Sequence, residues 1–200
     1  MTSTRRLVLA SASPARLRLL TTAGFAPEVV VSDVDEDAIT APSLPDLVLA
    51  LADAKASTVA SRSQVQGAVV LGCDSLLDVD GVAHGKPASV AEARARLTML
   101  RGRAAILRTG HCLIDTASGR RSSGVSSTDV RFAKFDDHEL EAYLATDEPL
   151  AVAGAFTLDG RSAPFIESIS GDYSNVIGLS LPLLRSLLAD VGIRVTELWT

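Results

Sequence analysis

Short apolar strands alternate with helical segments through the first half of the chain, and this order constrains the fold more than any other feature. Apolar runs predict strands over 6–10, 28–32 and 68–72. Apolar residues at helical spacing predict helices over about 15–23 and 44–61. Strands that alternate with helices are typical of an α/β protein whose sheet contains parallel strands.

The second half adds strand pairs joined by turns. Asp80-Gly81 predicts a hairpin turn after a separate strand over 76–79, and Ser118-Gly119 predicts a turn between two strands. The further strands are predicted over 105–116, 125–132, 154–160 and 165–168, and the further helices over about 90–100, 136–145 and 181–191. The sheet is therefore expected to be mixed. The chain of 200 residues fits a single domain over 1–200, which could consist of two lobes.

The charge pattern excludes some classes of partner. The net charge is -5, and Lys and Arg form no long cluster. A protein that binds duplex nucleic acid needs basic residues along one face, so no such partner is expected. No run of eighteen apolar residues is present, so no membrane helix is expected either. A local basic pocket for one small anion remains compatible with this charge.

The two cysteines, Cys73 and Cys112, are too few for a disulfide framework and form no C-x-x-C motif. Both adjoin apolar residues, which predicts buried thiols in a reducing compartment. We therefore expect a cytoplasmic protein.

The segment that follows the first predicted strand is a candidate phosphate site. Ser13 and Pro14 have the character of an N-cap and a first helical residue. The N–H groups of a helix start attract anions, Ser11 and Ser13 add hydroxyl groups, and Arg16 can donate two hydrogen bonds to phosphate oxygens. An ordinary capped helix explains the same residues.

Two groups of carboxylates are candidate metal ligands. The first is an acidic segment over 33–37 that contains Asp35 and Glu36. Mg²⁺ uses one or two carboxylates and keeps several waters, but a solvated acidic loop gives the same pattern. The second is Asp74, which is expected directly after the strand over 68–72, where open α/β sheets place ligands. A carboxylate so close to a buried strand needs a partner or a metal.

Lysine is rare, with 3 Lys against 16 Arg, so each Lys marks a position where an ammonium is used instead of a guanidinium. Lys55 lies inside a predicted helix, and Lys86 lies between Gly85 and Pro87. Chance and a solvated surface turn are the alternative explanations. No P-loop, dinucleotide fingerprint or nucleophile elbow is present.

Taken in order along the chain, these segments resemble the Maf family of nucleotide pyrophosphatases. The matching motifs cover nearly all 200 residues and are the segments 7–14 with Arg16, 33–36, 54–56, 72–75, 85–87, 101–103, 109–110, 141–143, 148–149, 153–155 and 171–179. Each motif is short, but their joint order is specific.

The resemblance implies a two-lobed α/β fold, similar to that of inosine triphosphate pyrophosphatases, with an extended twisted mixed sheet, a central cleft and a possible homodimer. It implies hydrolysis of nucleoside triphosphates, with non-canonical or modified nucleotides among the substrates, to the nucleoside monophosphate and pyrophosphate. The substrate partner is thus a small molecule, and the cofactor is a divalent cation, Mg²⁺ or Mn²⁺.

The resemblance also assigns roles to residues. It implies that the triphosphate lies near Ser11, Arg16, Lys55 and Lys86. The metal ligands it implies are Glu36 and Asp74, with Asp35 as a further one. Asp74 is then the candidate that activates the attacking water at the α-phosphorus.

Three positions depart from the family pattern. Ala15 stands where the family usually has Arg, and Val152 where it usually has Lys, which removes two positive charges. Asp159 occupies a position where the family usually has Gln, in the segment associated with the choice of nucleotide base. Asp159 is therefore a candidate substrate-binding residue, and its carboxylate is expected to change the preference for the base. Two other functions remain open: a nucleotide-binding regulator of cell division without strong catalysis, and a phosphatase that releases orthophosphate.

Overall fold

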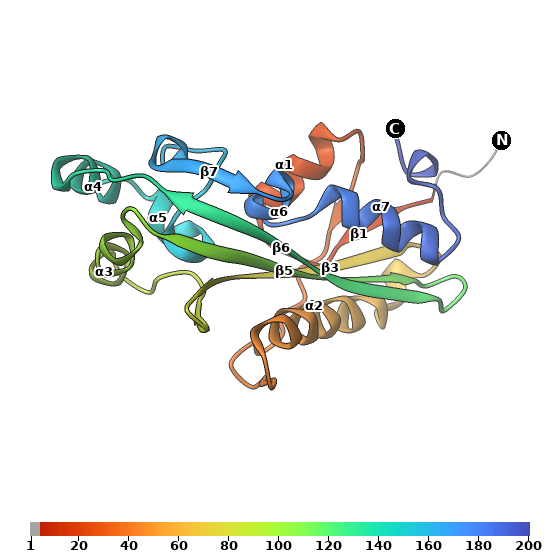
Figure 1. Cartoon of the computed structure of the whole chain (residues 1–200). Helices are drawn as coiled ribbons and strands as arrows, with labels where there is room; N and C mark the ends of the chain where they lie inside the picture. Colours follow the sequence, from red (N-terminus) through yellow and green to blue (C-terminus); the bar gives the residue numbers. More distant parts are fainter. Residues whose placement is uncertain (1–4) are drawn as a thin grey trace. The chain divides into compact units, whose positions relative to one another are not determined.

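A computed structural model describes residues 5–200, and the first four residues of the predicted 1–200 domain lie outside the described residues. Within residues 5–200, a seven-stranded sheet has the order β2-β1-β3-β5-β6-β7, and β4 pairs with β3 (Figure 1). The strands are β1 (Leu7–Leu9), β2 (Glu28–Val29), β3 (Val69–Val79), β4 (Val82–His84), β5 (Ala104–Asp115), β6 (Arg121–Phe132) and β7 (Ile166–Ser170).

The sheet is mixed, as the sequence predicts. Strand β1 runs parallel to both β2 and β3, with Leu7 opposite Val69 and Leu9 opposite Leu71. The pairs β3–β4 and β6–β7 are antiparallel. The α/β class is therefore confirmed.

Seven α-helices connect the strands of the described part of the chain. They are α1 (Pro14–Thr22), α2 (Leu44–Ala60), α3 (Val90–Leu100), α4 (Asp137–Leu144), α5 (Glu148–Ala151), α6 (Tyr173–Ile177) and α7 (Leu181–Asp190). The predicted cap of α1 is confirmed, since Ser13 accepts a hydrogen bond from the N–H of Arg16. On α4, Asp136 and Glu139 form a capping box. Between residues 5 and 200, no helix has both the length and the apolar character that a membrane crossing requires.

The chain divides into two compact units. Among the described residues, unit 1 comprises 5–74, Thr109–Ser126 and Gly178–Thr200, and unit 2 comprises Ser75–Arg108 and Ser127–Ile177.

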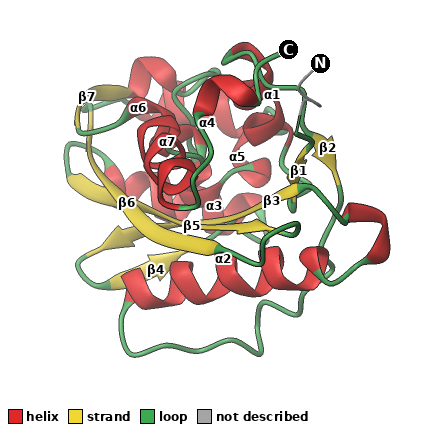
Figure 2. Cartoon of the chain, turned by 90° about the vertical axis from the view of Figure 1, so that its right-hand side faces the viewer, coloured by secondary structure: helices red, strands yellow, loops and turns green. Residues whose placement is uncertain are grey.

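Unit 1 has three layers. Leu7 and Leu9 of β1 pack in one core cluster with side chains of α1 and α7. Val8, which points to the opposite face, packs with Val59 of α2. Helix α2 therefore covers one face of the strands, and α1 and α7 cover the other (Figures 1 and 2).

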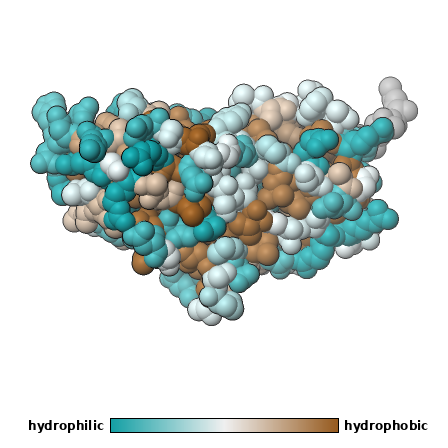
Figure 3. Space-filling view, viewed as in Figure 1, coloured by the Kyte–Doolittle hydropathy of each residue, from teal (hydrophilic) through white to brown (hydrophobic). Residues whose placement is uncertain are grey.

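Unit 2 buries one face of its strands. Leu77, Leu107 and Phe132, from three strands, share a core with Phe156 and with Leu100 of α3. A second cluster joins α3 to α4. Hydrophilic side chains gather over the outer surface of α3 and α4 (Figure 3).

Four predicted strands differ from the structure. The strand predicted over 154–160 is wrong: Gly154 and Ala155, with φ angles of 72° and 66°, belong to the 3-10 helix η2 (Ala153–Ala155), and residues 156–160 form a loop. The strand over 28–32 ends at Val29. The strands over 68–72 and 76–79 are one strand, β3, so Asp74 lies within a strand and not after one.

Candidate functional site

Hydrogen bonds close the turn between β1 and α1. The Ser13 hydroxyl accepts a hydrogen bond from the backbone N–H of Arg16 at 3.4 Å. The Ser11 hydroxyl accepts one from the backbone N–H of Ser13 at 3.2 Å and one from Arg16 Nη1 at 3.0 Å. The guanidinium of Arg16 is therefore held at the turn that leads into α1, where free N–H groups and the helix dipole favour an anion.

A neutral histidine helps to hold the segment that Arg16 contacts. Arg16 Nε donates to the carbonyl oxygen of Gly178 at 2.7 Å. Two residues further on, the Ser180 N–H donates to Nε2 of the buried His111 at 2.8 Å. Because Nε2 accepts, the ring proton belongs on Nδ1, which lies 3.1 Å from the Thr109 carbonyl oxygen. The sequence predicted only a strand position for His111, since its partner is 69 residues away.

Two glycines bring α2 close to the sheet. A Cβ atom on Gly72 of β3 would lie 2.3 Å from the carbonyl oxygen of Ala52, and one on Gly110 of β5 would lie 2.1 Å from that of Val48. No other residue type fits these positions without moving the helix. The close approach lets Lys55 of α2 reach Asp74 on β3. Glycine inside a strand pattern signals such an approach, so the sequence offered a clue here.

Lys55 joins two of the predicted carboxylates. Its Nζ lies 2.5 Å from Asp74 Oδ1 and 2.7 Å from Glu36 Oε1. The side chains of Lys55 and Asp74 are 9% and 10% exposed, whereas that of Glu36 is 53% exposed. The group therefore has a buried base and one solvent-facing carboxylate.

Burial raises the pKa of Asp74 above its ordinary value. The charges of Lys55 and Arg16 act in the opposite direction, but the net shift is upward. A carboxylate with a raised pKa accepts a proton more readily than an ordinary one, which suits a general base. The neighbouring Cys73 is unsuitable for this chemistry, since burial raises the pKa of its thiol to about 12.

Glu36 and Asp74 can hold a divalent cation. Both carboxylates already converge on one positive charge, the ammonium of Lys55. Two carboxylates with water in the remaining positions suit Mg²⁺. Asp35 is exposed and does not join them, and residues 5–200 contain no group of three or more His, Cys, Asp or Glu side chains that could hold a metal ion.

The two other predicted residues, Lys86 and Asp159, lie in unit 2. Lys86 is exposed on the loop between β4 and α3. Asp159 is also exposed, and its Oδ1 accepts a hydrogen bond from the Thr157 hydroxyl at 2.5 Å. Both side chains are accessible to a ligand.

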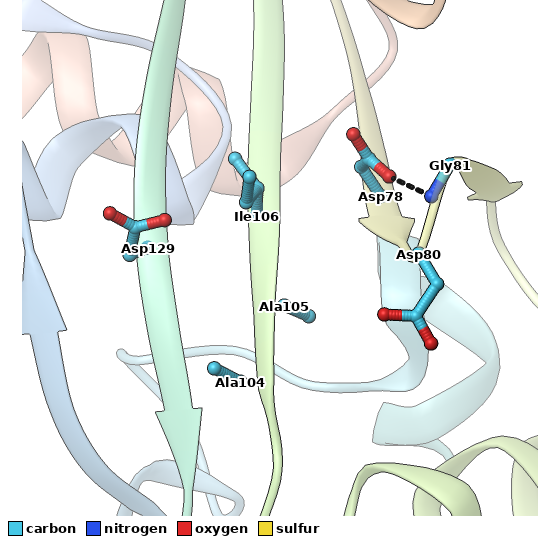
Figure 4. A pocket seen from close by; sticks show the side chains of 7 residues that line it. All are labelled: Asp78, Asp80, Gly81, Ala104, Ala105, Ile106 and Asp129. Atoms are coloured by element: carbon cyan, nitrogen blue, oxygen red, sulfur yellow. Dashed lines mark hydrogen bonds between the residues drawn. The ribbon is translucent and has the colours of Figure 1, made fainter.

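Unit 2 also has a cavity of about 370 Å³ that contains none of the predicted residues. It is lined by Asp78, Asp80, Gly81, Ala104, Ala105, Ile106 and Asp129 (Figure 4). Two of its three carboxylates have local partners: Asp78 accepts hydrogen bonds from the Gly81 N–H and from Arg108, and Asp80 pairs with Arg103.

Comparison with known proteins identifies the family to which this chain belongs. The model of the Maf-like protein family matches residues 6–191. The chain belongs to the Maf-like family. This Maf-like chain is 66% identical to a nucleoside triphosphate pyrophosphatase of Streptomyces coelicolor, over 98% of this chain and 95% of the relative. It is 62% identical to one of Streptomyces avermitilis and 53% identical to one of Synechococcus elongatus, with 98% of this chain covered in each case.

A solved structure, that of the Staphylococcus aureus Ham1 protein, is similar to this Maf-like chain with a TM-score of 0.38 and 14% identity. The match covers 65% of this chain and 73% of the Ham1 chain.

The two departures from the Maf pattern that remove charge lie in separate helical regions. Ala15 is in α1, next to Arg16, and Val152 follows α5. In this Maf-like chain Arg16 supplies a positive charge at the turn between β1 and α1, where its guanidinium donates a hydrogen bond to the Ser11 hydroxyl.

Proposed function

We propose that this chain hydrolyses nucleoside triphosphates to the nucleoside monophosphate and pyrophosphate. The observation that carries the proposal is the buried base Asp74. It pairs with Lys55 and is close enough to Arg16 for the charge of Arg16 to oppose the rise in pKa that burial causes. Membership of the Maf-like family and relatives named nucleoside triphosphate pyrophosphatase support it.

The residues of unit 1 supply most of the chemistry. Asp74 accepts a proton from the water that attacks the α-phosphorus. The bond from the α-phosphorus to the bridging oxygen of the β-phosphate breaks, so pyrophosphate leaves and the oxygen of the water stays on the monophosphate. Arg16 and Lys55 offset the negative charge of the phosphate groups, which grows on the leaving group. Glu36 and Asp74 would hold Mg²⁺ or Mn²⁺, and the cation would supply additional charge compensation. Asp35, which is exposed on the same segment as Glu36, is proposed as a further ligand on the family resemblance alone.

The same proposal covers the other candidate residues. The hydroxyls of Ser11 and Ser13 contact the phosphate groups, Lys86 adds an ammonium to them, and Asp159 lies near the base. The free, buried cysteines and the nucleotide substrate support a cytoplasmic protein. We also propose that residues 1–200 form one two-lobed domain and that the protein assembles as a homodimer, as the family resemblance implies.

The proposal is tested by identifying the products. We expect pyrophosphate and monophosphate from a panel of nucleoside triphosphates with Mg²⁺ or Mn²⁺, and loss of activity in excess EDTA. Orthophosphate as the main product, or full activity in EDTA, would contradict it. Nucleotide binding without turnover would instead favour the regulatory function.

A further inference from the structure

The loop that carries Lys86 is short and has a fixed conformation. It runs from Gly85 to Ala88, between the end of β4 at His84 and the N-cap of α3 at Ser89. Pro87 is buried and has a restricted φ angle, whereas Lys86 is exposed. Within residues 5–200, the ammonium of Lys86 has neither a hydrogen bond nor an ion pair. The loop therefore presents a free cation from a rigid backbone.

An ion pair on α3 holds both ends of this loop. Arg96 Nη1 donates to the carbonyl oxygen of Gly85 at 2.5 Å, and Glu92 Oε2 accepts from the N–H of Ala88 at 2.9 Å. The two side chains are joined to each other, since Arg96 Nη2 lies 2.5 Å from Glu92 Oε1. One pair, spaced i and i+4 on one helix, thus contacts the residues at either end of the loop.

A third contact strengthens the first anchor. The carbonyl oxygen of Gly85 also accepts a hydrogen bond from the N–H of Gly154 at 3.0 Å. The side chain of Arg96 is only 5% exposed, so its bond to Gly85 is shielded from water. Hydrogen bonds that involve a charged group are stronger than neutral ones, and shielding strengthens them further.

We propose that Arg96 and Glu92 are positioning residues for phosphate binding: their ion pair clamps the loop over Gly85–Ala88 and thereby fixes the place from which Lys86 meets a phosphate group. This inference rests on the proposed function, in which Lys86 binds the phosphate chain of a nucleotide. A fixed loop lowers the entropy that binding must remove, so the clamp should act on affinity for phosphate more than on the chemical step.

A second ion pair on α3 provides a matched control. Arg94 pairs with Glu141 of α4, and these side chains are 44% and 51% exposed. Arg94 is two residues from Arg96, but in the described part of the chain its side chain forms no hydrogen bond with the loop over Gly85–Ala88. Arg94→Met therefore removes an ion pair from the same helix without removing an anchor of the Lys86 loop.

The test is a double-mutant cycle between Arg96 and Lys86. The readouts are kcat, KM and the inhibition constant of inorganic tripolyphosphate, which carries a phosphate chain but no base. We expect Lys86→Met and Arg96→Met each to raise KM and the inhibition constant about five- to tenfold with a smaller change in kcat, as the loss of one charged hydrogen bond predicts. In the Lys86→Met background, Arg96→Met should change either constant by less than about twofold.

Equal effects of Arg96→Met with and without Lys86 would overturn the clamp, because they would show that Arg96 acts on stability or elsewhere. So would an equal effect of Arg94→Met, or no effect of Lys86→Met on the inhibition constant. Glu92→Ala keeps the test possible if Arg96→Met does not fold, since Glu92 is 45% exposed. Its effect should likewise disappear without Lys86. The identity of the product, pyrophosphate, tests the proposed function separately from all of these outcomes.

Discussion

At the scale of single residues, Asp74 shows how a buried strand can carry chemistry. It is buried within β3, yet it has Lys55 at 2.5 Å and the charge of Arg16 nearby. Without these cations, burial of the carboxylate would favour its protonated form still more strongly. The ammonium of Lys55 therefore favours the ionised form of Asp74, which can act as a base, against the effect of burial.

The first prediction concerns this base. Asp74→Asn should lower kcat by at least about a hundredfold, which is the usual scale for a lost general base. Asp78→Asn is the matched control, because Asp78 lies four residues further along β3 and, like Asp74, is paired with a cation, in this case Arg108. Steady-state kinetics and thermal melts of both variants decide the matter: near wild-type turnover of Asp74→Asn would remove its proposed role.

The second prediction concerns the base of the nucleotide. An ionised Asp159 only accepts hydrogen bonds, and it already accepts one from Thr157, whereas Gln both donates and accepts. Asp159→Gln should shift kcat/KM toward uracil and thymine nucleotides by up to about tenfold, the value of one hydrogen bond. Asp147→Gln, at another exposed aspartate, should leave the ranking of substrates unchanged. An unchanged ranking in Asp159→Gln would show that this side chain does not contact the base.

At the scale of elements, the position of α2 depends on two glycines that the sequence pattern alone does not connect. Gly72 and Gly110 lie 38 residues apart on β3 and β5, and each faces a backbone carbonyl group of the helix. The helix brings Lys55 to Asp74, so an error in its position changes the candidate site directly.

The third prediction follows from this contact. Gly110→Ala should lower the free energy of unfolding by about 2–3 kcal/mol, the scale of overpacking against a backbone that cannot move freely. It should also weaken tripolyphosphate binding, because α2 carries Lys55. Gly124→Ala on β6 is the control, since its new methyl group would meet the flexible side chain of Leu183 at 3.4 Å. Urea denaturation measures the difference, and equal stability of the two variants would contradict the proposed packing.

At the scale of the whole molecule, the core of unit 1 contains both thiols. Cys73 and Cys112 have no exposed surface, and burial raises their pKa values to about 12 and about 11. A thiol reacts as its thiolate, so neither should react readily at neutral pH while unit 1 is folded.

The fourth prediction uses this property. A thiol reagent at pH 8 should label neither cysteine of the native protein within the time needed to label both in urea. Bound nucleotide should slow labelling further, because a ligand of the folded state lowers the unfolded fraction. Rapid labelling of the native protein would show that the core of unit 1 opens locally, and the labelled position would identify where.

The sequence by itself determined the α/β class, the mixed sheet, the capped first helix and the order of motifs that identified the family. These features depend on local patterns: apolar periodicity, and Ser13 directly before Pro14. The rarity of lysine singled out Lys55, and the place of Asp74 after a predicted buried strand singled out that carboxylate.

Only the tertiary structure decided how such residues combine. It placed Asp74 inside β3, because pairing with Lys55 allows a strand to continue through a carboxylate. It replaced the predicted strand over 154–160 by the end of the 3-10 helix η2 and a loop, because Gly154 and Ala155 adopt positive φ angles that apolar periodicity does not reveal. The partnerships of His111 with Ser180 and of Arg96 with Gly85 likewise join separate segments. A sequence pattern records which side chains are available, whereas the hydrogen-bond partner of a buried polar group depends on which segments the packed core brings together.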